Sequence, residues 1–223
     1  TASITSTDKL KTGSINIIKY LYNDDTKNPN NVSPLQYVGF TAYFLGNKEF
    51  IDSSKVLYVK STDEIPGDKT YQTFTDYKKS PKNVDYIIVT DTDISRLTSA
   101  GSLTTGKDGT GSINNLKYGC YVLKETSVPT GVEVNTLDPQ IIDVNEVSSN
   151  TDNPIKLYNE NFYYPLTIKK TDDDKNALPN AVFEILDSNK NRVGNNYTTN
   201  KNGIITTNPL KAGKYYVREV KSP

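Results

Sequence analysis

Two charged residues of this sequence lie where strand alternation points them toward a core. Lys19 lies in the segment SINIIKY (14–20) on the side of Ile15 and Ile17, and Glu125 ends GCYVLKE (119–125) on the side of its Tyr and Leu. Residues i, i+2 and i+4 of a strand share one face. A charge on a buried face is costly unless it is paired or its pKa shifts, downward for Lys and upward for Glu. A neutral buried Lys is a nucleophile, and a protonated buried Glu can donate a hydrogen bond to an amide and move protons.

An electrophile for such a lysine occurs in the segment PIKLYNEN (154–161). Ile155 and Leu157 share one strand face with Asn159, and Asn161 follows two residues later. If Lys19 attacks either side-chain amide while Glu125 polarises it, ammonia leaves and an isopeptide bond joins the first strand to the last. The pattern leaves both asparagines open as acceptors. An ordinary buried Lys–Glu ion pair is the noncovalent alternative.

The composition argues against most other chemistry. The 223 residues contain no His, so the usual general base, the Ser-His and Cys-His pairs and the commonest transition-metal ligand are missing. We expect the single Cys120 to be a small, partly exposed side chain without a special role. Lys plus Arg and Asp plus Glu both number 26, which gives no indication of a nucleic-acid partner. No apolar run approaches the roughly 20 residues of a membrane span.

Acidic clusters occur in the segments TDDDKN (171–176) and DTD (91–93). Neither segment fits a calcium loop, because the Gly of the sharp turn and the closing Glu are missing. We interpret both as solvated turns and predict neither a metal site nor a cofactor.

The residues that could react must be positioned by β-strands. Short runs rich in Ile, Val, Thr and Tyr alternate with Asn-Gly, Asp-Gly and Pro turns, which predicts an all-β protein. Only TDTDISRLTSAG (90–101) has a helical pattern, enough for one or two turns.

The chain repeats its own pattern. The segment SINIIKY (14–20) matches PLTIKKT (165–171). The segment TTGKDGTGSINNLKYGCYVLKE (104–125) matches TTNKNGIITTNPLKAGKYYVRE (198–219). The second copy therefore contains Lys170 and Glu219 where the first has its inward Lys and Glu. This order predicts two domains, 1–162 and 163–223, with a long insertion at about 46–103 in the first.

The motif Gly-x-Tyr-x-Leu-x-Glu-Thr-x-x-Pro-x-Gly (119–131), with the Lys-ended first strand and the late Asn, resembles the collagen-adhesin B-type (Cna B) domain. That domain occurs in sortase-assembled pilins and surface adhesins of Gram-positive bacteria. The resemblance covers nearly all of the chain except 46–103. It implies tandem immunoglobulin-like β-sandwiches and an autocatalytic bond between Lys19 and Asn159, or Asn161, promoted by Glu125.

The second domain departs from the family pattern. It has Lys170 and also Glu219, the counterpart of the catalytic Glu125. No closing strand or acceptor Asn follows them within the 223 residues. We therefore expect its sandwich to be incomplete in this sequence. Its acceptor would come from further chain or from a strand of another molecule, by β-strand addition.

A second departure concerns polymerisation. Shaft pilins of the family are similar in a Tyr-Pro-Lys segment whose Lys links subunits, but here Leu166 follows the Pro and Glu160 stands where a Lys might. No Leu-Pro-x-Thr-Gly sorting signal is present. Lys156, Lys78 or Lys79 would be weak substitutes for the linking Lys.

These features predict a structural subunit of a pilus or adhesin stalk on the surface of a Gram-positive bacterium, with other surface subunits as partners. It would be extracellular, and it would be no enzyme beyond a single self-crosslinking turnover. The bond would carry tension and stabilise the fold by roughly 4 kcal/mol or more. The alternative is an adhesin whose insertion binds a host protein or glycan. A secreted hydrolase has little support, because no carboxylate pair stands out.

Overall fold

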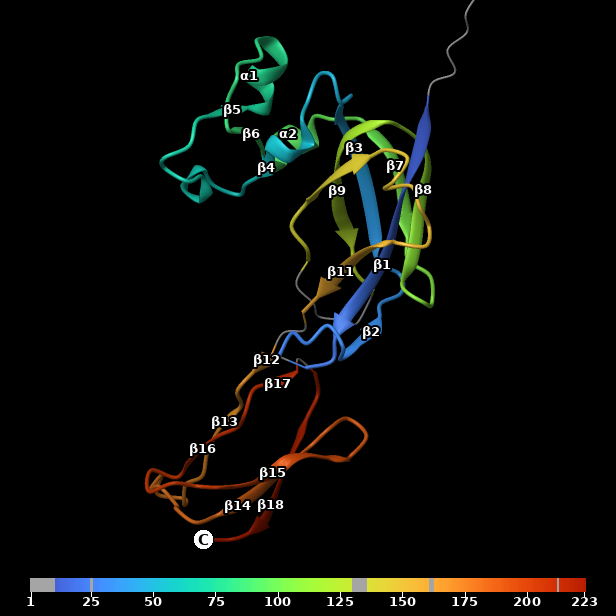
Figure 1. The fold of residues 1–223 in the computed structure, drawn as a ribbon. Helices are drawn as coiled ribbons and strands as arrows, with labels where there is room; N and C mark the ends of the chain where they lie inside the picture. Colours follow the sequence, from blue (N-terminus) through green and yellow to red (C-terminus); the bar gives the residue numbers. More distant parts are fainter. Residues whose placement is uncertain (1–10, 25, 130–135, 161–162, 212) are drawn as a thin grey trace, which may run out of the picture. The chain divides into compact units, whose positions relative to one another are not determined.

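The computed structural model describes residues 11–24, 26–129, 136–160, 163–211 and 213–223 (Figure 1). The chain divides into two compact units, one comprising Thr1–Asn23 and Lys27–Asn159 and the other Asp24–Thr26 and Glu160–Pro223. Strands dominate both units, so the predicted all-β, immunoglobulin-like fold is confirmed. Among the described residues, no helix has the length and apolar character to cross a membrane.

One sheet of the first unit is built around its first strand, β1 (Thr12–Tyr22). Strands β8 (Thr110–Lys117) and β2 (Val32–Pro34) pair antiparallel with successive parts of β1. The last strand of the unit, β11 (Ile155–Asn159), pairs parallel with β1. The first and last strands of the unit are therefore direct neighbours.

The other sheet of the first unit is antiparallel and has the order β10-β9-β3-β7. Its strands are β3 (Gly39–Gly46), β7 (Ser99–Thr104), β9 (Gly119–Ser127) and β10 (Gln140–Val144).

The core of the first unit collects apolar side chains from both sheets. Alternate residues of each strand point into it, as the period of two requires. Its buried members include Ile15, Ile17, Phe40, Ala42, Ile113, Tyr121, Leu123, Ile142 and Leu157. These strands therefore form a sandwich whose inner faces meet in one core.

The insertion between β3 and β7 has a fold of its own. Three short strands form a parallel sheet in the order β4-β6-β5, and two short α-helices accompany them (Figure 1), together with two short 3-10 helices. The elements are η1 (Ser53–Lys55), β4 (Val56–Tyr58), η2 (Thr62–Glu64), β5 (Tyr71–Thr73), α1 (Phe74–Lys79), β6 (Tyr86–Val89) and α2 (Asp91–Ser95).

Helix α2 lies in the segment with the helical pattern, whereas α1 was not predicted. Thr73 caps α1 by accepting a hydrogen bond from the backbone N–H of Asp76. Phe74 is the buried residue of α1. A six-residue helix with a single buried side chain shows no apolar periodicity, so the sequence pattern could not reveal it.

The insertion packs against the face of β9 that is turned away from the sandwich core. Cys120 and Val122 of β9 share a second apolar cluster with Phe74, Ile87 and other side chains of the insertion. Cys120 is only 1% exposed, so the expectation of a partly exposed side chain is wrong. Burial raises the pKa of this thiol to about 12, which keeps it protonated and unreactive.

The second unit contains smaller sheets and a smaller core. Its strands are β12 (Tyr163–Tyr164), β13 (Thr167–Lys169), β14 (Val182–Leu186), β15 (Arg192–Thr198), β16 (Ile204–Thr206), β17 (Leu210–Lys211) and β18 (Tyr216–Lys221). They pair as β12-β17, β13-β16 and β15-β14-β18. Ala181, Phe183 and Ile205 form the buried cluster. Among the strands that the structure describes, β13 pairs only with β16, whereas its counterpart β1 also pairs with a parallel strand.

Candidate functional site

Lys19, Glu125 and Asn159 meet in the core of the first unit. Lys19 lies on β1 and Asn159 ends β11 in one sheet, while Glu125 lies on β9 in the other. Lys19 is 0% exposed, Asn159 1% and Glu125 5%. The alternation that points neighbouring apolar residues inward also points these three polar side chains inward.

Each of the three side chains contacts the other two. Lys19 Nζ donates a hydrogen bond to Asn159 Oδ1 at 2.6 Å, and Asn159 Nδ2 donates one to Glu125 Oε1 at 3.0 Å. Glu125 Oε2 lies 2.8 Å from Lys19 Nζ. That oxygen accepts no hydrogen bond of suitable angle, so the last contact is an ion pair rather than a hydrogen bond. The three side chains form a closed triangle of amine, amide and carboxylate.

The surroundings of the triangle weaken the positive charge of Lys19. Burial is the largest influence and lowers the pKa of its amine from 10.5 to about 8, although the adjacent carboxylate of Glu125 opposes the change. The Phe40 ring, whose centre lies 5.4 Å from the amine, favours the charged form as well and so also opposes the change. A substantial neutral fraction is therefore present near neutral pH, and neutral amine is the nucleophilic form.

A glycine turn fixes the backbone of Lys19. The N–H of Lys19 donates to the carbonyl of Gly109 at 2.8 Å, and its carbonyl accepts from the N–H of Leu35 at 2.9 Å. Gly109 has φ of +77°, and a Cβ at this position would lie 2.3 Å from the Lys19 carbonyl oxygen. Gly203 has the same relation to Lys170 in the second unit, at 2.4 Å. The sequence repeat contains both glycines, but it did not single them out as positioning residues.

The triangle has the parts needed for an exchange of amides. Nζ and Nδ2 each contact one oxygen of Glu125, so this carboxylate can accept a proton from the attacking amine and deliver one to the departing nitrogen. The Nζ–Cγ bond forms, the Cγ–Nδ2 bond breaks, and one ammonia leaves. Neither a cofactor nor an oxidant is required.

The counterpart pair in the second unit is less enclosed. Lys170 Nζ lies 3.0 Å from Glu219 Oε2, but their side chains are 31% and 29% exposed. Within the described residues, these two side chains bond to each other and to no amide. Asn161, the other proposed acceptor, lies outside the described residues.

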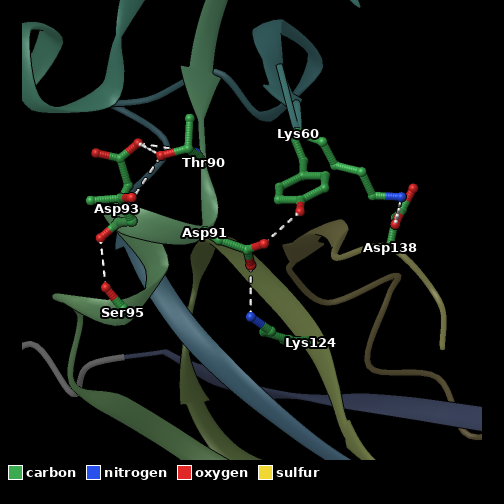
Figure 2. Close-up of polar contacts among 9 residues, drawn as sticks. Lys60, Thr90, Asp91, Asp93, Ser95, Lys124 and Asp138 are labelled. Atoms are coloured by element: carbon green, nitrogen blue, oxygen red, sulfur yellow. Dashed lines mark hydrogen bonds and ion pairs between the residues drawn. The ribbon is translucent and has the colours of Figure 1, made fainter.

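The two acidic clusters have structural roles. Asp172 accepts hydrogen bonds from the backbone and side chain of Asn176, which lower the pKa of its carboxyl group. Asp93 completes the capping box of α2 with Thr90, and Asp91 Oδ1 accepts a hydrogen bond from Lys124 Nζ at 2.7 Å (Figure 2). No group of three metal-ligating side chains occurs in the part of the chain that the structure describes.

The contacts of Asp91 also attach the insertion to the sandwich. Its carboxylate accepts a hydrogen bond from Tyr58 of β4 at 3.1 Å and pairs with Lys124 of β9 (Figure 2). Lys60 of the insertion pairs with Asp138, just before β10, at 2.6 Å. Polar contacts therefore flank the apolar contact between the insertion and the β9 sheet.

Comparison with known proteins identifies a family and several related structures. The model of the SpaA prealbumin-like fold domain matches residues 69–160 and again 165–223. The first match contains Glu125 and Asn159, and the second contains Lys170 and Glu219. No curated protein matches the chain.

Several solved structures are similar to this chain at low identity. The Bacillus anthracis TIE protein is 21% identical over 95% of this chain, with a TM-score of 0.56, and the chain spans 29% of that protein's length. The shaft pilin spaA from Lactobacillus rhamnosus GG is 18% identical, with a TM-score of 0.41 and coverage of 96% of this chain and 89% of the pilin. GBS52, the minor pilin of Streptococcus agalactiae, is 17% identical, with a TM-score of 0.35 and coverage of 95% and 84%.

Proposed function

The chain belongs to the SpaA family of prealbumin-like fold domains, and from that premise we propose that it is a structural subunit of a Gram-positive pilus or adhesin stalk. In this proposal it contributes tandem domains of the collagen-adhesin B-type, 1–162 and 163–223, to an extracellular assembly with other surface subunits. Its chemistry is a single self-crosslinking turnover. The buried triangle of Lys19, Glu125 and Asn159 carries the proposal, because it joins nucleophile, proton carrier and acceptor in one core.

Glu125 is the catalytic residue in this mechanism, and Lys19 and Asn159 become the bonded pair. Asn161 stays the alternative acceptor. We assign Lys170 and Glu219 the same roles in the second domain, with an acceptor Asn supplied by another segment of polypeptide.

The proposed bond would act mechanically. Lys19 and Asn159 are 140 residues apart, so their bond would close almost the whole first unit into a loop. Tension entering through β1 would cross the bond and leave after β11. The strands inside the loop, and the insertion with them, would carry no load.

Intact mass under denaturing conditions tests the bond. We expect a mass lower than the sequence mass by one ammonia, and a cross-linked peptide that joins Lys19 to Asn159. A peptide joined to Asn161 would change the acceptor, and a loss of two ammonias would reveal a bond in the second unit as well. The unmodified mass would contradict the proposed chemistry and leave an ordinary buried ion pair.

Matched variants assign the roles. Lys19→Met, Glu125→Gln and Asn159→Ala should each restore the unmodified mass. Lys156→Met changes a lysine on the exposed side of β11 and should leave the ammonia loss unchanged. Loss of the bond in this control would show that any change near β11 blocks the reaction.

A further inference from the structure

A cavity opens between the two short helices of the insertion, outside the triangle. Its volume is about 310 Å³, which is near the lower end for small-molecule sites. Phe74 and Leu97 give it apolar walls, and Thr75 and Asp93 give it polar groups. The remaining lining residues are three cations, Lys78 and Lys79 of α1 and Arg96 after α2.

Among the residues that the structure describes, the three cations have no acidic partner. In the described residues, none of the ion pairs includes Lys78, Lys79 or Arg96. The Lys78 amine lies 5.5 Å from the centre of the Phe74 ring instead. Cations are favourable near helix C-termini, but α1 has six residues and α2 five, so their dipoles are a weak reason for three cations to converge.

The neighbouring carboxylates are already bonded elsewhere. Asp93 accepts hydrogen bonds from Thr90 and Thr75, and Asp91 is held by Lys124 and the Tyr58 hydroxyl (Figure 2). The cavity therefore has an excess of positive charge, although the whole chain has a formal net charge of zero.

We propose that this cavity binds an acidic sugar, a six-membered ring that bears a carboxylate. The cations would pair with the carboxylate, with Arg96 able to bind it through two parallel hydrogen bonds. Phe74 and Leu97 would contact the apolar face of the ring, and the Thr75 hydroxyl would accept a hydrogen bond from one of its hydroxyls. The size of the cavity suits one ring better than a peptide segment, which would need an extended groove. This site adds a binding activity and does not depend on the cross-link.

Titration of the isotope-labelled full chain with sodium glucuronate tests the site, with neutral glucose as the matched sugar. We expect glucuronate to shift the backbone amide signals of α1 and α2 and glucose to shift none of them. The double variant Lys79→Gln, Arg96→Gln should weaken glucuronate binding about tenfold or more, because two charged donors to the carboxylate are lost. Both side chains are exposed, so the variant should keep the fold and its other signals.

Three results would overturn the proposal. Glucose could bind as tightly as glucuronate, which would remove the role of charge. Sodium acetate could bind as tightly, which would reduce the site to a bare anion site. The control Lys48→Gln, an exposed lysine of the insertion outside the cavity, could weaken binding as much as the double variant, which would mean general charge attraction.

Discussion

The same Lys–Glu pair occurs in both units of the molecule, and the two copies differ mainly in burial. The ion-pair distance is 2.8 Å for Lys19 and Glu125 and 3.0 Å for Lys170 and Glu219. The exposed fractions of the side chains are 0% and 0% in the first pair, but 31% and 29% in the second. Nearly equal distances thus coexist with very different surroundings, and the surroundings decide whether the amine can become a nucleophile.

A neighbouring strand accounts for much of this difference. Strand β11 pairs with β1 and brings Asn159 beside Lys19. Among the described strands, β13 has no such parallel neighbour, and Lys170 stays in partial contact with water. Strand β11 therefore both shields Lys19 from water and supplies Asn159 as the acceptor of the proposed bond.

The largest expected effect separates the two glutamates. Glu125→Gln should abolish the ammonia loss and lower the free energy of unfolding of the first unit by about 5 kcal/mol, because a loop of 140 residues is no longer closed. Glu219→Gln should change the free energy of unfolding by less than about 1 kcal/mol, because its pair is partly solvated. Intact mass and denaturant unfolding measure both effects. Equal losses of stability would remove the distinction between the pairs.

The two turn glycines provide a sharper comparison. Gly109→Ala and Gly203→Ala should each destabilise their unit by about 1–3 kcal/mol, because both have a positive φ and both touch a lysine carbonyl. Only Gly109→Ala should also slow the cross-link, since it displaces the backbone of Lys19. Mass spectra taken during refolding give the rate. A normal rate in Gly109→Ala would show that the turn does not position the amine.

The rate of cross-linking should depend on pH through Lys19. Because burial lowers the pKa of this amine to about 8, the reactive neutral form decreases as the pH falls below that value. The rate should therefore rise about tenfold per pH unit below about pH 8 and level off above it. A chain purified in denaturant and then refolded at several pH values provides the measurement. A flat profile would mean that proton loss from Lys19 does not limit the reaction.

The smallest expected effect concerns a left-handed position that both units share. Tyr37 has φ of 61° and donates its N–H to Thr105, while Asn180 has φ of 66° and donates to Thr199. Asn tolerates this backbone better than Tyr, and the Tyr37 side chain is 59% exposed. Tyr37→Asn should stabilise the first unit by about 0.5–1 kcal/mol. Asn180→Tyr should have the opposite effect in the second unit, and thermal unfolding compares the two. Destabilisation by Tyr37→Asn would show that the ring makes a stabilising contact.

Strand alternation was sufficient to place three polar side chains in one core. The two-residue alternation of a strand determines on which face each side chain lies. Lys19, Glu125 and Asn159 could therefore be predicted to point inward. The alternation does not state the register between strands, and register decides which Asn reaches Lys19. The parallel pairing sets Leu21 opposite Asn159, a relation between distant segments that no local pattern contains.

The insertion shows what alternation cannot reveal. The face of Cys120 could be predicted, but not the layer that covers it, because that layer comes from another part of the chain. The parallel sheet and α1 are made of short elements stabilised mainly by tertiary contacts, and their sequences have little periodicity of their own.

The parallel pairing of β1 and β11 has a consequence for length. Because both strands run in the same direction, the chain enters the first sandwich at one end and leaves it at the opposite end. An antiparallel pair would return the chain to its starting end, and the unit would then be a side branch that adds nothing to reach. In the proposed stalk, the first unit would therefore act as an in-line spacer that lengthens the polypeptide by the span of its own sandwich.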